Sequence, residues 1–171
     1  MPLNTGSHYS LAFNVNAMGR WARKAVDVLH TEIKSERVPL FIYQGFSGIA
    51  HGQAVARVWH RKHGAGYGQM YVRKYEENSH GADVEFCLPA RDSRLVEPYA
   101  LVFVDDFVDS GATRKRVVHE VAEWWHGNMP DSEIMPTDVY TLARPPGYPS
   151  DPPTLRKDGL KDILTDALGG D

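Results

Sequence analysis

The sequence predicts an α/β fold in which a mostly parallel sheet of five strands is flanked by helices. Short apolar runs alternate along the chain with longer segments whose apolar residues recur at three- and four-residue steps, as in strands followed by amphipathic helices. One run is apolar throughout, which is typical of a central parallel strand covered on both faces. With 171 residues, the chain is long enough for one domain and too short for two ordinary ones. We therefore expect a single domain over residues 1–171.

The predicted strands are the apolar runs at 40–43, 69–73, 84–88, 100–104 and 138–142. The helical patterns lie between them, at about 16–37, 49–62 and 112–126. Asn16 is the expected cap of the first helix, and Gly127 marks the end of the third. Residues 144–153 carry five prolines and predict an irregular arm, whereas 155–168 predict a short helix. The core is then expected over about 16–143, with a small hood built from 1–15 and 144–171.

Composition excludes several classes of partner. The formal net charge of -3 lacks the basic excess of a nucleic-acid surface, so no nucleic-acid partner is expected. Apolar runs stay well below the roughly 18 residues of a membrane span, and the N-terminus lacks the pattern of a signal peptide. These features predict a cytoplasmic protein without a membrane partner. The single cysteine, Cys87, lies between Phe86 and Leu88, which predicts a buried, inert strand position.

The segment from Leu101 to Thr113 carries the clearest chemical pattern. An apolar strand runs into two adjacent carboxylates, Asp105 and Asp106, and the small residues 110–113 then open a helix. Carboxylates accept hydrogen bonds from sugar hydroxyls with a metal ion nearby, while backbone N–H groups at a helix start bind phosphate. A capped helix would explain Asp-Ser-Gly alone, yet two acids after an apolar strand need something to neutralise them. The whole segment therefore predicts a site for a ribose 5-phosphate.

This segment resembles the signature of type I phosphoribosyltransferases. The resemblance implies that Asp105 and Asp106 contact the ribose hydroxyls of phosphoribosyl pyrophosphate and approach Mg2+ indirectly, through the ligand or water. It implies that the following loop holds the 5-phosphate through Asp109, Ser110, Gly111, Ala112 and Thr113. The family also places a pyrophosphate-binding loop after its first core strand, which here comprises Gln44, Gly45, Phe46, Ser47 and Gly48. Backbone N–H groups between the glycines suit that anion, although this stretch alone is also typical of a tight turn.

A charged loop at 73–81 is similar to the mobile catalytic loop of orotate phosphoribosyltransferases. Its ends match at Arg73, Lys74, His80 and Gly81, but two glutamates stand where that pattern has its second lysine. The resemblance implies that Arg73 and Lys74 neutralise the charge of departing pyrophosphate and that His80 donates a proton. A solvated charged hairpin is the alternative interpretation.

The resemblance implies an enzyme that binds Mg2+-phosphoribosyl pyrophosphate, transfers the phosphoribosyl group to a nitrogenous base and releases pyrophosphate, commonly as a homodimer. Asp109 stands where purine-using members have a catalytic aspartate, whereas the loop at 73–81 indicates orotate-like chemistry, so the base stays open. The altered loop also favours a non-catalytic regulator or sensor on the same fold. A third hypothesis is an enzyme that hydrolyses this ligand or uses another pyrophosphorylated ribose.

Several residues near these motifs are predicted to be structural. Arg114, Lys115 and Arg116 fall in the first turn of a helix, where we expect them to be solvated. The pair Trp124–Trp125 is expected in the core or at a subunit interface. His51 lacks the spacing of a metal ligand and gives no functional signal.

Overall fold

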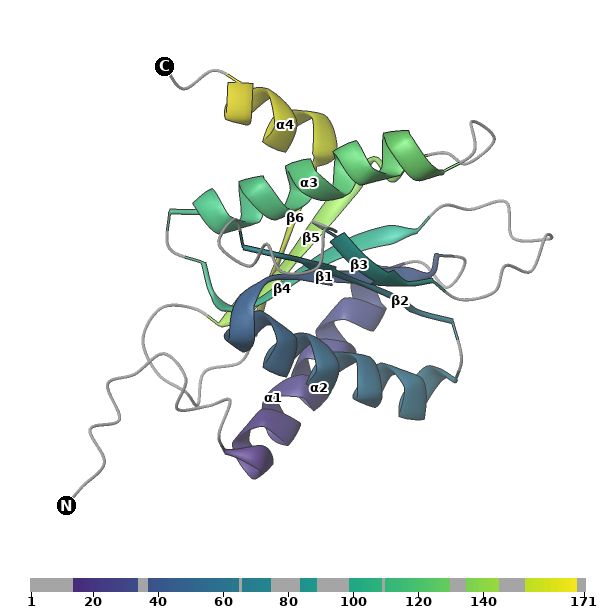
Figure 1. Ribbon diagram of the computed structural model, residues 1–171. Helices are drawn as coiled ribbons and strands as arrows, with labels where there is room; N and C mark the ends of the chain where they lie inside the picture. The colour runs from purple at the N-terminus through teal and green to yellow at the C-terminus, as the bar shows by residue number, and fades with distance from the viewer. Residues whose placement is uncertain are drawn as a thin grey trace.

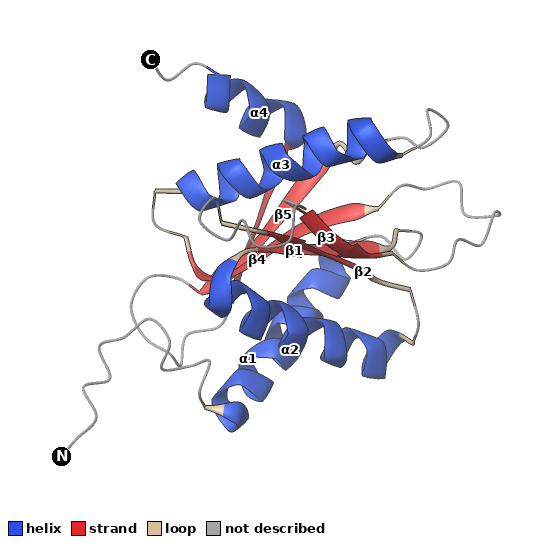
Figure 2. Cartoon of the chain, in the orientation of Figure 1, coloured by secondary structure: helices blue, strands red, loops and turns tan. Residues whose placement is uncertain are grey.

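The computed structural model describes residues 14–33, 37–64, 66–74, 84–88, 99–108, 110–129, 135–144 and 153–168. These residues form three layers, with a sheet between helices (Figure 1 and Figure 2). Helices α1 (Val15–Glu32) and α2 (Gly45–His63) cover one face, and α3 (Ala112–Asn128) and α4 (Leu160–Leu168) cover the other. The predicted α/β class is confirmed. Within the described residues, no helix combines the length and the apolar character that a membrane span requires.

The sheet has six strands in the order β3-β2-β1-β4-β5-β6. They are β1 (Pro39–Tyr43), β2 (Gly68–Val72), β3 (Val84–Cys87), β4 (Ala100–Phe107), β5 (Asp138–Arg144) and β6 (Thr154–Gly159). The pairs β2–β1, β1–β4 and β4–β5 are parallel, whereas β3 and β6 join the two edges in antiparallel pairs. A mostly parallel sheet is therefore confirmed, with one strand more than the five predicted.

Strand β6 corrects the prediction for the C-terminal region. The sequence assigns 144–153 to an arm and 155–168 to a helix, but residues 154–159 pair with β5, and α4 begins only at Leu160. The six residues Thr-Leu-Arg-Lys-Asp-Gly contain no apolar run and only partly bury their side chains. An edge strand of this kind is held by its backbone ladder, so hydrophobic patterning does not reveal it.

Other element boundaries also differ from the predictions. The side chain of Asn14 accepts a hydrogen bond from Ala17 N–H at 3.0 Å, so Asn14 caps α1 in place of Asn16. Helix α1 ends at Glu32 and α3 continues past Gly127. Cys87 is exposed, and the prediction of a buried cysteine is wrong because β3 is an edge strand that buries only its first residue.

Apolar side chains divide into two cores because successive residues of a strand point to opposite faces. On β4, Val102 and Val104 pack toward α1 and α2, whereas Leu101 and Phe103 pack toward α3 and α4. Trp125 belongs to the second core and is 2% exposed, in agreement with its predicted core position. Both faces of β4 are thus buried as far as Val104, the residue before the two aspartates. This burial fixes the position of the segment Leu101–Thr113.

Alanine substitutions at two helical glycines are expected to change the free energy of unfolding in opposite directions. In α2, a Cβ at Gly52 would lie 2.5 Å from Cδ1 of Tyr43. The Tyr43 hydroxyl donates to Gln69 and accepts from Gln53, each at 2.9 Å, so its ring has little room to move. Gly52→Ala should lower the free energy of unfolding by about 1–3 kcal/mol. A Cβ at Gly127 would have no atom within 4 Å, so Gly127→Ala should raise the free energy of unfolding by up to about 1 kcal/mol. Urea unfolding measures both, and equal shifts would contradict the packing argument.

Candidate functional site

The strand order of the sheet reverses between β1 and β4. From β1 it extends to β2 and β3, and from β4 it extends the other way to β5 and β6. Helix α2 follows β1 on one face and α3 follows β4 on the opposite face (Figure 1). In open α/β sheets, ligands bind at the carboxyl ends of strands at such a switch point. A cavity of about 350 Å³ lies there, between the first turn of α2, the end of β4 and the start of α3.

The residues predicted to bind pyrophosphate form the first turn of α2 and its N-cap. Gln44 is the cap, and the helix begins at Gly45, whose φ of 67° lies in the left-handed region that favours glycine. A Cβ at Gly48 would lie 3.2 Å from Tyr43 Cβ and 3.5 Å from the carbonyl oxygen of Val104, so this turn sits directly on the sheet. Gly48 is buried, whereas the cavity wall includes Gln44, Gly45, Phe46 and Ser47.

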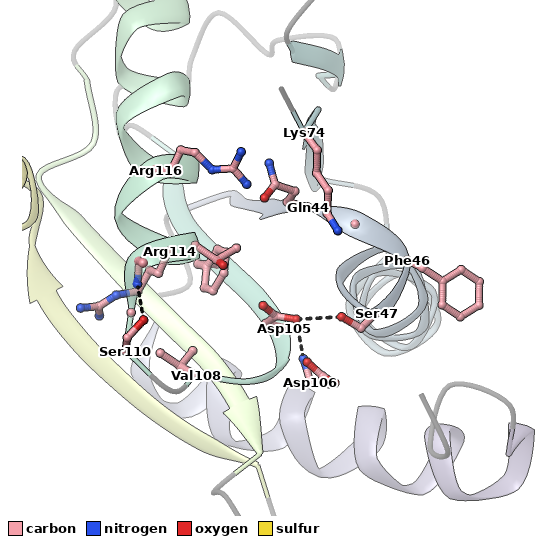
Figure 3. Close-up of a pocket in the computed structure, with 15 residues that line it drawn as sticks. Gln44, Phe46, Ser47, Lys74, Asp105, Asp106, Val108, Ser110, Arg114 and Arg116 are labelled. Carbon is pink, nitrogen blue, oxygen red and sulfur yellow. Dashed lines mark hydrogen bonds between the residues drawn. The ribbon is translucent and has the colours of Figure 1, made fainter. Parts of the chain in front are cut away.

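Asp105 and Asp106 lie at the end of β4, which continues through both residues instead of ending at Val104. The pairing with β5 shifts register between Val104 and Phe107, as in a β-bulge. Oδ1 of Asp105 accepts hydrogen bonds from Ser47 Oγ at 3.1 Å and from Asp106 N–H at 2.8 Å (Figure 3). Asp106 is 4% exposed. The fold therefore joins the acidic pair to the first turn of α2, 58 residues away in the chain.

Burial, followed by a hydrogen bond with the Asp106 side chain, raises the pKa of Asp105 from 3.8 to about 7. Two carboxylates this close resist ionising together, and a divalent cation would relieve that repulsion. Carboxylate oxygens are ligands that Mg2+ prefers, so the donor set suits this ion. Within the described residues, no group of three or more His, Cys, Asp or Glu could hold a metal.

The raised pKa of Asp105 predicts how stability depends on pH. The folded state binds this proton more tightly than the unfolded state, so the stabilisation is complete below about pH 4 and is lost as pH rises through about 7. Asp105→Asn removes the titration. Relative to the wild type, the variant should gain more than about 1 kcal/mol of unfolding free energy between about pH 5 and pH 8, because one pKa unit corresponds to about 1.4 kcal/mol. Urea titrations across this range test the prediction, which fails if the difference is independent of pH.

The start of α3 forms the wall opposite α2. Gly111 is the N-cap with a left-handed φ of 78°, and Ser110 Oγ accepts a hydrogen bond from Ala112 N–H at 3.3 Å. The cavity wall includes Ser110, Gly111, Ala112 and Thr113. Asp109 lies outside the described residues. Because the N-terminus of a helix carries partial positive charge and exposes N–H groups, this wall suits an anion such as a phosphate.

Arg114 corrects the expectation of a solvated first turn. It is 8% exposed, and its Nη1 donates to Thr141 Oγ1 at 3.1 Å and to Asp158 Oδ2 at 2.6 Å. Thr141 lies on β5 and Asp158 on β6, so the side chain ties the start of α3 to two strands. The sequence around Arg114 does not indicate this burial, because the two partners lie 27 and 44 residues away in the chain.

The two described residues of the predicted catalytic loop have different positions. Lys74 lines the cavity, and a Cβ at Gly45 would lie 3.2 Å from its Cε. Arg73 is not in the cavity wall, and its guanidinium pairs with Glu85 on β3. The Arg73 carbonyl oxygen accepts a hydrogen bond from Gln44 Nε2 at 3.0 Å, which fastens the end of β2 to the cap of α2. His80 lies outside the described residues, as do positions 75–83 as a whole.

Two residues of the site region gave no functional signal in the sequence. Arg116 was expected in solvent but lines the cavity, and it follows Thr113 by three residues on the same helix face. His51 is fully buried one turn after Ser47, with Nδ1 2.8 Å from the Ser47 carbonyl oxygen. Burial lowers the pKa of His51, so the neutral ring donates from Nδ1 and supports the turn that carries Ser47. The helical spacings 47–51 and 113–116 are the signals that could have linked both residues to the motifs.

The fold and cavity define an α/β protein with a cavity at the switch point of its sheet. Neither a protein-family model nor a curated protein matches the sequence. Solved structures of similar fold include phosphoribosyltransferases, the family that the sequence resembles. Orotate phosphoribosyltransferase from Francisella tularensis is 11% identical, with a TM-score of 0.49, and the alignment covers 72% of this chain and 56% of that one.

Two purine enzymes show similar values. A hypoxanthine phosphoribosyltransferase variant from Trypanosoma cruzi, complexed with IMP, is 13% identical with a TM-score of 0.42, over 81% of this chain and 59% of that one. The enzyme from Leishmania tarentolae, in complex with GMP, is 16% identical with a TM-score of 0.41, over 80% of this chain and 66% of that one. The chain thus spans less than two thirds of these enzymes, and its function has to be inferred from its own cavity.

Proposed function

We propose that this chain binds Mg2+-phosphoribosyl pyrophosphate and transfers its phosphoribosyl group to a nitrogenous base, releasing pyrophosphate. One observation carries the proposal: two helix starts and a pair of carboxylates meet in a single cavity at the β1–β4 switch point. Helix starts attract phosphate groups, and carboxylates accept hydrogen bonds from hydroxyl groups. Phosphoribosyl pyrophosphate carries a phosphate, a diol and a diphosphate on one ribose, which matches this combination.

In the proposed complex, Asp105 and Asp106 accept hydrogen bonds from the ribose hydroxyls. The residues from Asp109 to Thr113, which lead into α3, hold the 5-phosphate, and the N-cap and first turn of α2, from Gln44 to Gly48, hold the diphosphate. Mg2+, when bound beside the acidic pair through the ligand or water, neutralises part of the diphosphate charge. The raised pKa of Asp105 supports this arrangement, because the pair gains most from a neighbouring cation.

In the proposed reaction, the bond between C1 of the ribose and the pyrophosphate oxygen breaks, and its electron pair leaves with pyrophosphate. A lone pair of a base nitrogen forms the new bond to C1, and Asp109 accepts the proton of that nitrogen. Lys74 and the start of α2 stabilise the charge of the leaving group. His80 donates a proton to pyrophosphate. Arg73 leaves its ion pair with Glu85 and contacts the leaving group, to which it supplies positive charge.

The proposal is tested with the purified chain, phosphoribosyl pyrophosphate and Mg2+, by following pyrophosphate release with a panel of bases. The panel contains adenine, guanine, hypoxanthine, uracil and orotate, because Asp109 favours a purine and the loop at 73–81 favours orotate. We expect release that depends on one class of base and stops when EDTA removes Mg2+. Saturable binding of the ligand without release from any base would rule out the transferase.

A second candidate function is a regulator or sensor that binds the same ligand without turnover. The observation that favours it is the presence of Glu76 and Glu77 where the similar loop of orotate phosphoribosyltransferases has a lysine. The binding and release measurements separate the two functions. Formation of free ribose 5-phosphate in the absence of any base would instead indicate a hydrolase.

A further inference from the structure

The cavity has opposite charges on its two sides. Asp105 and Asp106 supply carboxylates at the end of β4, whereas Lys74 and Arg116 supply cations from the end of β2 and from α3. Figure 3 shows the Lys74 and Arg116 side chains reaching into the cavity from different walls, with Gln44 between them. The predicted functions of the motifs account for the carboxylates and for Lys74, but they leave the guanidinium of Arg116 without a role.

Gln44 provides a second, independent observation at this end of the cavity. It is 4% exposed, and its Nε2 is committed to the Arg73 carbonyl oxygen. Among the residues that the structure describes, its buried Oε1 has no hydrogen-bond partner. A buried carbonyl oxygen in this state is unfavourable until a donor reaches it. An ionised phosphate offers only acceptors, so the donor has to come from another group.

We propose that Arg116 and Lys74 form a diphosphate-binding subsite in which Gln44 Oε1 orients the Arg116 guanidinium. A guanidinium has five N–H donors in a planar fork, so one can bond Gln44 Oε1 while others contact an anion. The proposal rests on the function proposed above and deepens it, because it names a further group that stabilises the leaving pyrophosphate. Arg116 then contacts the leaving group directly and is a catalytic residue.

The arrangement also explains how the chain compensates for its altered loop. The positions 76 and 77 are glutamates and supply no positive charge to a departing pyrophosphate. Arg116 supplies that charge from a helix whose side chains at 117 and 118 are fully buried, so the cation has a rigid base. A cation fixed before the reaction stabilises developing charge without reorganisation at the moment of bond breaking.

Isothermal titration with two probes tests the subsite directly. Inorganic pyrophosphate with Mg2+ probes the subsite, and ribose 5-phosphate probes the acidic pair and the start of α3. Arg116→Gln should weaken pyrophosphate binding by about tenfold to hundredfold, since hydrogen bonds between charged groups contribute about 1.5–3 kcal/mol. Its affinity for ribose 5-phosphate should change less than about twofold. The matched control Lys115→Gln removes a neighbouring cation that is not in the cavity wall and should leave both affinities unchanged.

The outcomes separate this inference from the proposed function. Unchanged pyrophosphate affinity in Arg116→Gln overturns the subsite, even when ribose 5-phosphate binds. Absence of ribose 5-phosphate binding in the wild type overturns the proposed function, while a pyrophosphate affinity that depends on Arg116 still supports the subsite. For an active wild type, Arg116→Ala should lower kcat by about 10²–10³-fold, and added guanidinium ion should restore part of it. Equal rescue of Lys115→Ala would contradict a specific role.

Discussion

Replacing Asp105 and Asp106 together by asparagine should weaken the binding of phosphoribosyl pyrophosphate by at least about 100-fold. Hydrogen bonds from hydroxyl groups to a carboxylate contribute about 1.5–3 kcal/mol each, and the neutral amides also lose their attraction for Mg2+. Asparagine has nearly the same shape as aspartate, so Ser47 Oγ and Asp106 N–H retain an oxygen acceptor at 105. The measurement is isothermal titration of the ligand with and without Mg2+.

The control removes the same number of charges outside the cavity. Asp27 on α1 and Asp162 on α4 are exposed, and neither lines the cavity. Asp27→Asn with Asp162→Asn should leave the affinity within about twofold, because exposed charges far from a ligand are screened by salt. If the variant at 105 and 106 retained wild-type affinity in the folded state, the acidic pair would not be the ribose site.

Asp158→Asn should lower the free energy of unfolding by about 3–5 kcal/mol, because it leaves the Arg114 guanidinium buried without its counter-ion. The Arg114 and Asp158 side chains are only 10% and 15% exposed, and their 2.6 Å contact joins the start of α3 to β6. Thr141 is a neutral partner and does not replace the lost charge. Urea unfolding monitored by tryptophan fluorescence measures the change, and a loss below about 1 kcal/mol would contradict the buried pair.

A neighbouring pair serves as the matched control. Arg156 also contacts Asp158, at 2.8 Å, but its side chain is 70% exposed. Arg156→Gln should therefore cost less than about 1 kcal/mol. A double change, Arg114→Met with Asp158→Leu, removes both buried charges and should be more stable than Asp158→Asn alone. That order of stabilities would show that the cost arises from an uncompensated charge rather than from a damaged strand.

The prediction of fold class rested on features that are local in the chain. Apolar runs such as 100–104 and helical periodicities such as that of α1 are visible within a few residues, and all five predicted strands exist. The sixth strand was missed because its six residues contain no apolar run and pair through the backbone at a sheet edge. Cys87 was misplaced for a related reason, since apolar neighbours do not distinguish an edge strand from a central one.

The candidate site was predictable to the extent that its parts are contiguous. Of the predicted ligand-binding residues, those from 105 to 113 that the structure describes lie in one wall region of the cavity, and Gln44–Ser47 lie in another. The roles of these residues, and of Asp109 and His80, stay predictions. Arg114 and Arg116 show the limit of such patterns. Both were expected in solvent on one turn of a helix, but Arg114 is buried and Arg116 lines the cavity.

Local order therefore specified the elements and the segment Leu101–Thr113, because periodicity and a contiguous motif need no knowledge of distant residues. Three-dimensional packing specified everything that depends on contacts between distant parts of the chain. It placed Ser47 on Asp105, Asp158 on Arg114 and Lys74 beside Gly45, and it raised the pKa of Asp105 by burial. The physical reason is that these contacts depend on the order of the strands in the sheet. That order brings distant strand ends together, and no single segment encodes it.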